Sequence, residues 1–477
     1  MYKNSLVSIE DLSNEEIEDI LDLAQEMQQN LRAFPTLASG NIMASLFFEA
    51  STRTRGSFES AMNRLGGRTI TTTGIGSSSL EKGETLADTV RVWSSYSDLI
   101  VLRHPWEGAA RLAVDYASVP VINAGDGGHE HPTQTLCDLF TLRAEKRNLE
   151  GLKVALCGDL KHGRTVHSLI FGLLRFGAEL YFVPGEGLDL PEHVKTKIEA
   201  QYKRPIEKIP AGDFQALYGG QTGGSQDGEP LDALYMTPSK PHLRTLFEDE
   251  PNFEFKTSPG REVVFYVTRR QTERETGSPS AQAPVGKYPR ISKATMKKRF
   301  SRATVLHPLP RVDELSYDMD DDHRSKYFVQ AAYGVPVRMA LISLILELKP
   351  WKKAGERRAE SQVEEPTIVA TQGIECANPN CVTNRESQSC ESRFLVFTEP
   401  QVRFTCNYCG WEIAPIFYGT QQRGRKIYKP IGKLRFKSQH QLFQFRFFCS
   451  EDEALGEGFV SVSSAVETAA PVFEVKD

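Results

Sequence analysis

The sequence has little of what disulfide-rich, membrane and nucleic-acid-binding proteins need. Only 8 of its 477 residues are cysteine, which is too few for a disulfide scaffold. The longest apolar run, residues 339–346, is far shorter than the roughly 20 residues that span a bilayer. The first ten residues contain no apolar segment of the signal-peptide type. These absences predict a globular protein of the cytoplasm without a membrane segment.

The charge is also nearly balanced, with 57 Lys and Arg against 62 Asp and Glu. This balance argues against a protein dominated by nucleic-acid binding. Hydrophobic residues make up 40% of the chain, which is typical of folded domains. The length of the chain predicts about three folded domains.

Apolar segments with the spacing of strands and helices alternate along the first 350 residues. The run 42–48 is typical of a buried strand, and the apolar stripe within 58–65 is typical of an amphipathic helix. A second strand, turn and helix follow one another over 152–174. This alternation predicts an α/β fold of open parallel sheets covered by helices.

We expect two domains of this kind, followed by a linker and a small β-rich domain. The expected bounds are 1–148 for the first domain, 149–324 for the second, 325–350 for a helix returning to the first, 350–373 for the linker and 374–477 for the last domain.

The segment from Ser51 to Arg55, Ser-Thr-Arg-Thr-Arg, lies between a predicted strand and a predicted helix. The N-terminus of a helix offers unpaired N–H groups and the positive end of its dipole. Hydroxyl and guanidinium groups at the same place suit a phosphate or carboxylate ligand. The alternative is a capped helix with solvated arginines.

Three other polar clusters follow predicted strands. Arg103 ends one strand, His131-Pro-Thr-Gln134 follows a glycine-rich turn, and His307-Pro-Leu-Pro-Arg311 follows another strand. Each cluster alone is more typical of a stiff loop or a helix start than of a ligand site. Because ligands of open α/β sheets bind at the carboxyl ends of the strands, the clusters together predict one shared site.

The three motifs that begin at Ser51, His131 and His307 resemble those of the transcarbamylases. The segments 82–88, 158–165 and 266–271 are similar to further motifs of that family, in particular of the catalytic chains of aspartate carbamoyltransferase. The resemblance covers about residues 1–350, and the six motifs occur in family order. It implies a carbamoyl-phosphate-binding domain, an aspartate-binding domain and a homotrimer, alone or as two joined trimers, with active sites at the subunit interfaces.

The resemblance also implies roles for individual residues. Carbamoyl phosphate would be held by Arg53, Thr54, Arg103, His131, Gln134 and the backbone of Leu309 and Pro310, with Ser51, Thr52 and Arg55 in the same cradle. Ser79 and Lys82 would lie on a mobile loop that serves a neighbouring subunit. The carboxylates of L-aspartate would be bound by Arg164, Arg269 and Gln271, and Glu49 would orient an arginine. The catalytic set implied by the resemblance would be Arg53, Thr54, Lys82, Arg103 and His131.

This chain departs from the family pattern at two places. The spacing between Ser79 and Lys82 is about one residue shorter than in the family, and an insertion of about forty residues lies near 200–250.

The implied reaction suits these residue types. When an amine attacks the carbonyl of carbamoyl phosphate, the site must stabilise an oxyanion and a leaving phosphate, which preorganised positive charge can do without a catalytic cofactor. Lys82, Arg164 and Arg269 would favour a dicarboxylate acceptor and repel cationic ornithine. The predicted activity is therefore transfer to L-aspartate, an early step of pyrimidine synthesis.

Four cysteines near the end of the chain have the spacing of a metal site, namely Cys376, Cys381, Cys406 and Cys409. Two paired-cysteine knuckles predict a structural Zn²⁺ site. The segments around them resemble the zinc domain of the regulatory chain of aspartate carbamoyltransferase. The basic run 423–437 beside this domain could bind nucleic acid, but strands with a solvated charged face explain it more simply. A non-catalytic scaffold whose zinc end binds nucleic acid or a partner is the rival hypothesis.

Overall fold

The computed structural model describes residues 4–74, 83–146, 148–161, 163–203, 206, 208–210, 219–221, 231–237, 253–255, 263–269, 290–299, 302–312, 314–354, 368–370, 375–386, 389–397, 403–422, 424–431 and 445–461. The chain divides into two compact units. The first contains Met1–Pro105 and Ala113–Ser361, and the second contains Trp106–Leu112 and Gln362–Asp477.

The first unit contains a four-stranded parallel sheet with the order β2-β1-β3-β4. Its strands are β1 (Ile42–Phe47), β2 (Arg68–Thr73), β3 (Leu99–His104) and β4 (Val121–Asp126). The helices that alternate with them are α2 (Thr52–Arg64), α3 (Leu86–Ser94), α4 (Ala109–Tyr116) and α5 (Pro132–Lys146). The first four residues of α4 are counted with the second unit. Strands β1, β3 and β4 are buried almost throughout, as expected for parallel strands covered on both faces.

A second parallel sheet in the same unit has the order β11-β10-β8-β5-β6. Its strands are β5 (Lys153–Gly158), β6 (Glu179–Pro184), β8 (Ala233–Met236), β10 (Val264–Val267) and β11 (Thr304–Leu306), with the helices α6 (Arg164–Arg175), α7 (Glu192–Tyr202) and α10 (Lys293–Arg299). A separate antiparallel pair is formed by β7 (Gly219–Gln221) and β9 (Phe253–Phe255). Two parallel sheets with intervening helices confirm the predicted α/β fold.

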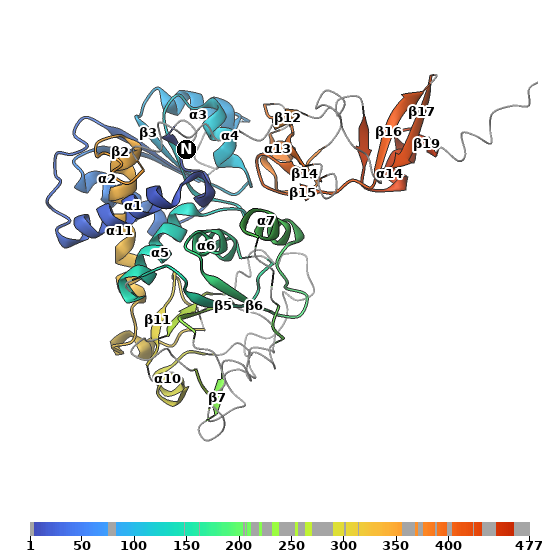
Figure 1. Cartoon of the computed structure of the whole chain (residues 1–477). Coiled ribbons are helices and arrows are strands. Elements are labelled where there is room, and N and C mark those ends of the chain that lie inside the picture. Colours follow the sequence, from blue (N-terminus) through green and yellow to red (C-terminus); the bar gives the residue numbers. More distant parts are fainter. Residues whose placement is uncertain are drawn as a thin grey trace, which may run out of the picture. The chain divides into compact units, whose positions relative to one another are not determined.

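Helix α11 (Tyr327–Ile345) packs against α1 (Asn14–Gln29), α2 and α5 (Figure 1). Its side chains belong to the apolar core that it shares with those helices. Among the described residues it is the one helix with the length and apolar composition of a membrane span, and 67% of that window is buried inside the protein. These features are those of a central core helix.

The second unit is rich in β-structure, as predicted. One antiparallel sheet contains β12 (Ile368–Ala370), β13 (Arg393–Phe397), β14 (Arg403–Cys406) and β15 (Glu412–Ile413). A further sheet, of order β18-β16-β17-β19, contains β16 (Phe417–Gln422), β17 (Arg425–Pro430), β18 (Arg446–Phe448) and β19 (Val460–Ser461). The helices are α13 (Val382–Arg385) and α14 (Glu451–Gly456).

The second unit also includes Trp106–Leu112, which lies far away in the sequence. The N–H of Glu107 donates to the carbonyl of Asn380 at 3.0 Å, and the carbonyl of Glu107 accepts from the N–H of Val382 at 2.8 Å. The Asn378 amide donates to the Glu107 carboxylate at 2.6 Å. Contacts between residues more than 270 positions apart leave no signal in local sequence, so the expected domain bounds placed this segment in the first domain.

Candidate active site

The N-terminus of α2 presents its first turn without a side-chain cap. Ser51 is the N-cap residue, and its side chain makes no capping hydrogen bond. The N–H groups of the first turn have no acceptor within a helix, and Thr54 is buried beside them. An uncapped first turn with nearby hydroxyl groups retains the features of an anion site.

The Arg53 side chain connects the start of α2 to the loop that follows β11 of the second sheet. Its Nη2 atom donates to the carbonyl of Leu309 at 2.6 Å. Partial burial of the Arg53 guanidinium and the neighbouring charge of Arg269 lower the pKa of Arg53. Because like charges disfavour each other, an anionic ligand at this place would be stabilised by both guanidinium groups. The structure therefore brings together Arg53, Leu309 and Arg269, which the sequence places in three separate motifs.

Arg103, at the end of β3, is held by two acceptors. Its Nη2 atom forms an ion pair with the Glu49 carboxylate at 2.9 Å, and its Nη1 atom donates to the carbonyl of Ala124 at 3.1 Å. The residue is only 6% exposed. A cation fixed in this way needs little reorganisation when negative charge develops nearby. The contact with Glu49 agrees with the orienting role that the resemblance implies for that acid.

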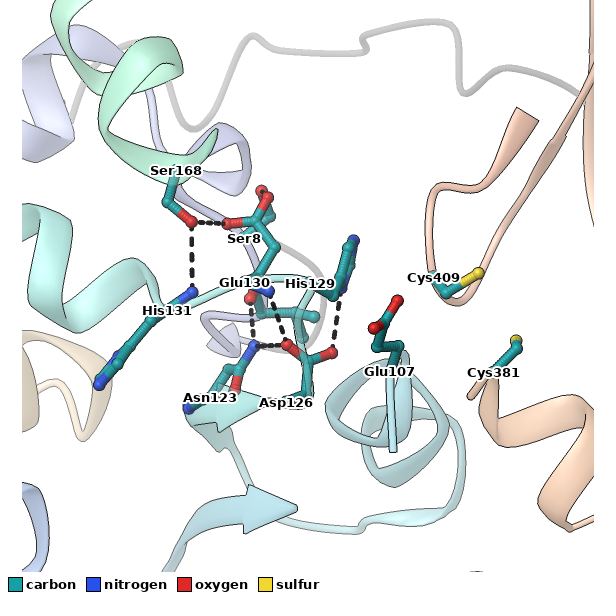
Figure 2. A network of polar contacts seen from close by, with 12 residues as sticks. Ser8, Glu107, Asn123, Asp126, His129, Glu130, His131, Ser168, Cys381 and Cys409 are labelled. Atoms are coloured by element: carbon teal, nitrogen blue, oxygen red, sulfur yellow. Dashed lines mark hydrogen bonds and ion pairs between the residues drawn. The ribbon is translucent and has the colours of Figure 1, made fainter. Parts of the chain in front are cut away.

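The glycine-rich turn before His131 is braced by polar contacts (Figure 2). The Asp126 carboxylate accepts from the Asn123 amide and from the N–H of Glu130, both at 3.0 Å. The N–H of His131 donates to Ser168 Oγ at 3.2 Å, and that hydroxyl donates to the Glu130 carboxylate at 2.5 Å. Since Ser168 lies on α6, the position of His131 depends on the helix that follows β5 of the second sheet.

Gly125 lies close to Arg103 and His131, two residues of the predicted catalytic set. A Cβ atom at this position would lie 3.0 Å from Arg103 Nη1 and 3.6 Å from His131 Cδ2. Its φ of +118° is also unfavourable for any other residue. The absent side chain therefore lets Arg103 and His131 approach the same space.

We expect Gly125→Ala to lower kcat/KM for carbamoyl phosphate by about 10- to 100-fold, because a small displacement of positioned groups has effects of this size. Steady-state kinetics on the folded variant would measure it. Gly40→Ala is the matched control, because Gly40 has a φ of +89° and no neighbour within 4 Å of the added methyl group. Equal activities of the two variants would contradict a role for this gap.

The loop after β11 is organised by His307. The N–H of Leu309 donates to His307 Nδ1 at 2.8 Å, so the ring proton lies on Nε2, which faces Glu314 Oε1 at 2.8 Å. Burial lowers the pKa of His307, which favours this neutral ring. Leu309 has a φ of +53°, and the bond to Pro310 is cis. The Leu309 carbonyl of this loop accepts the hydrogen bond from Arg53.

The remaining predicted residues are placed as follows. Thr52 is exposed on the first turn of α2, and Arg55 lies 3.8 Å from Glu59 on the same helix. Gln134 donates from Nε2 to the Asp138 carboxylate at 2.9 Å. Helix α6 begins at Arg164, but the side chain of Arg164 lies outside what the structure describes. Ser79, Lys82 and Gln271 lie outside the described residues.

Sequence reasoning missed the residues that hold the predicted site residues in place by hydrogen bonds. Ser168 and Glu130 hold His131, and Asp138 holds Gln134. Asp138 could have been noticed, because it follows Gln134 by four residues on a predicted helix. Ser168 is far away in the sequence and carries no comparable signal.

The four predicted cysteines lie together in the second unit. Their sulfur atoms are all within 4.8 Å of one another, and all four residues are buried. The Cys376–Cys409 and Cys381–Cys406 sulfur pairs are 3.5 and 3.8 Å apart. Zn–S bonds of about 2.3 Å in a tetrahedron place the sulfurs about 3.8 Å apart. The cluster therefore fits a tetrahedral metal ion.

A parallel α/β fold with Arg53, Arg103 and Arg269 at or after strand ends is typical of proteins that bind anionic ligands at that edge of the sheet. Family models identify the class. Residues 4–144 match the carbamoyl-P binding domain of aspartate/ornithine carbamoyltransferases, and residues 264–345 match their Asp/Orn binding domain. Residues 368–415 match the metal binding domain of the aspartate carbamoyltransferase regulatory chain.

Curated relatives narrow this class. The chain is 43% identical over 349 residues to the aspartate carbamoyltransferase catalytic subunit of Thermoplasma volcanium, covering 72% of this chain and 99% of that protein. It is also 43% identical over 345 residues to that of Methanocaldococcus jannaschii, covering 72% and 97%.

Solved structures agree with these relatives. The catalytic subunit of M. jannaschii aspartate transcarbamoylase has a TM-score of 0.55 and 41% identity, covering 72% of this chain and 99% of that one. The Trypanosoma cruzi enzyme in complex with N-(phosphonacetyl)-L-aspartic acid has a TM-score of 0.54 and 35% identity, covering 71% and 94%. This chain belongs to the aspartate carbamoyltransferase family, as the sequence motifs predicted.

Proposed function

We propose that this chain transfers the carbamoyl group of carbamoyl phosphate to the amine of L-aspartate. The products are N-carbamoyl-L-aspartate and phosphate, and the reaction belongs to pyrimidine synthesis. Two observations support this proposal: Arg53 reaches the Leu309 carbonyl and is influenced by the charge of Arg269, and Arg103 and His131 lie near the same space at Gly125. In the proposal, these two groups share one site. A T. cruzi relative has been solved in complex with carbamoyl phosphate and aspartate, which supports the same substrates here.

Each group has a role in this proposal. The first turn of α2 and Arg53 bind the phosphate group. Arg103 and His131 stabilise the oxyanion that forms when the aspartate amine attacks the carbonyl carbon. Arg269 binds a carboxylate of aspartate. The C–N bond forms in this addition, the C–O bond to phosphate breaks when the oxyanion collapses back to a carbonyl, and the leaving phosphate takes the amine proton, so that no protein base is needed.

We further propose that a homotrimer in the cytoplasm is the working form, and that the cysteine cluster holds Zn²⁺ for structure only. The donor set of four cysteine sulfurs and their spacing support zinc. The resemblance supports the trimer, because Ser79 and Lys82 would complete a neighbouring subunit's site. Arg164 and Gln271 would complete the aspartate site.

A colorimetric assay for carbamoyl aspartate tests the activity. We expect product from carbamoyl phosphate and L-aspartate, and none when L-ornithine replaces aspartate. Absence of product with metal-loaded protein at saturating substrates would favour the rival hypothesis of a non-catalytic scaffold. The mass in solution tests the assembly, with three chains, or six as two trimers, as the expected result and a monomer as the contradicting one.

A further inference from the structure

Asp138, on α5, is a buried acid to which the proposed reaction assigns no role. It is 1% exposed, yet a single oxygen of its carboxylate, Oδ1, accepts three hydrogen bonds. The donors are Gln134 Nε2 at 2.9 Å, the Tyr266 hydroxyl at 2.9 Å and Gln330 Nε2 at 3.1 Å. They come from α5, β10 and α11, so one atom connects three elements of the first unit.

These contacts determine which way two amide groups face. A carboxylate can only accept hydrogen bonds, so each glutamine must turn its NH₂ group toward Asp138 and its oxygen away. The consequence is visible at Gln330, whose Oε1 accepts from the N–H of His307 at 2.9 Å. Asp138 therefore anchors, through Gln330, the loop that presents the Leu309 carbonyl.

The orientation of the Gln134 amide group is also set by Asp138. Its Nε2 is engaged by Asp138, which leaves Oε1 as an acceptor on a half-buried side chain. Gln134 lies in the first turn of α5, and its N–H donates to the carbonyl of His131 at 2.9 Å. Gln134 is therefore adjacent in the chain and by hydrogen bond to His131, and the resemblance implies that both residues hold carbamoyl phosphate.

We propose that Asp138 is a positioning residue that sets the selectivity for the carbamoyl donor. By holding the Gln134 amide in one orientation, it makes Gln134 Oε1 accept a hydrogen bond from the NH₂ group of carbamoyl phosphate. An acyl phosphate with a methyl group at that place, such as acetyl phosphate, leaves this oxygen without a donor. The inference rests on the proposed function.

The chemistry explains why orientation matters. If Gln134 rotated by half a turn, its NH₂ group would face the NH₂ group of the substrate, and two donors would meet. A site that offers an acceptor to a substrate NH₂ group discriminates against analogues without it, because the buried acceptor is left unsatisfied. Burial raises the pKa of Asp138 to about 7, so the comparison is made at about pH 8.5, where the carboxyl group is ionised.

The test compares binding of the two phosphates in the full-length protein. The measured quantity is the ratio of Ki for acetyl phosphate, as a competitor of carbamoyl phosphate, to KM for carbamoyl phosphate. We expect this ratio to fall about tenfold in Asp138→Ala, as for the loss of one hydrogen bond. In Asp138→Asn we expect a fall of about threefold, because a neutral amide oxygen is a weaker acceptor than a carboxylate.

Two control variants distinguish a positioning role of Asp138 from an unspecific effect of a buried substitution on the fold. Thr141→Val removes a buried hydroxyl one turn further along α5, where it donates to the Cys137 carbonyl, and should leave the ratio unchanged. Gln134→Ala should lower the ratio about tenfold, and Asp138→Ala should lower it no further in that background.

An unchanged ratio in a folded Asp138 variant would overturn the proposal, even if kcat fell. So would a further loss in the Gln134→Ala background. If Asp138→Ala does not fold, Asp138→Asn decides by the same criteria. A wild-type protein that makes no carbamoyl aspartate would instead show that the proposed function itself is wrong.

Discussion

Arg103→Ala is expected to lower kcat by at least about 10²-fold, with KM for carbamoyl phosphate changed far less. The guanidinium is held by Glu49 and the Ala124 carbonyl before substrate arrives, so its charge acts mainly as the oxyanion develops. Loss of one such donor typically raises the barrier by about 2.7–4 kcal/mol. Initial rates of carbamoyl aspartate formation at saturating substrates would measure the effect.

Arg91→Ala is the control for this experiment. Arg91 lies on α3, with an exposed side chain that pairs with Asp88 at 3.2 Å, and its loss should leave kcat within about twofold, since surface pairs contribute little. Near-wild-type turnover of Arg103→Ala would remove Arg103 from the chemical step. A large rise in KM at constant kcat would instead assign it to ground-state binding.

Cys381→Ser is expected to release the metal and unfold the part of the second unit around the cysteine cluster. Structural zinc contributes about 10–16 kcal/mol to the folding of zinc-finger peptides, and the four cysteines are buried together. The neighbours of Cys381 also pair with Glu107, so the segment Trp106–Leu112 should lose protection from hydrogen exchange. Metal content by mass spectrometry and hydrogen exchange would measure both effects.

Cys449→Ser is the matched control, because Cys449 is exposed and lies outside the cluster. It should retain the metal and the exchange pattern. Carbamoyl aspartate formation should persist in Cys381→Ser, with changed assembly or cooperativity, because the proposed catalytic groups lie in the first unit. Loss of the chemistry in a protein whose first unit stays folded would contradict a purely structural role for the metal.

The parts of the site that could be predicted from the sequence are those encoded locally. The helix that begins after Ser51, the buried strand before Arg103 and the glycine-rich turn before His131 each depend on a few consecutive residues. Their polar groups follow strand ends, where parallel sheets place ligands. The two cysteine knuckles are also local, and their spacing indicated a metal site.

The parts that could not be predicted depend on contacts between distant residues. The hydrogen bond from Arg53 to Leu309 joins positions 256 apart, and the bond from Gln330 to Asp138 joins positions 192 apart. No periodicity or motif records such a partner, because each residue alone is compatible with many neighbours.

Residue order along this chain was therefore enough to predict the α/β class, the transcarbamylase motifs and the cluster of four cysteines. Tertiary packing alone decided which acceptor each arginine and amide would face, and that the segment Trp106–Leu112 would join the C-terminal unit. The physical reason is that backbone propensities and apolar periodicity act over a few residues. The orientation of a buried polar group is instead set by whichever donors and acceptors the fold brings within about 3 Å of it.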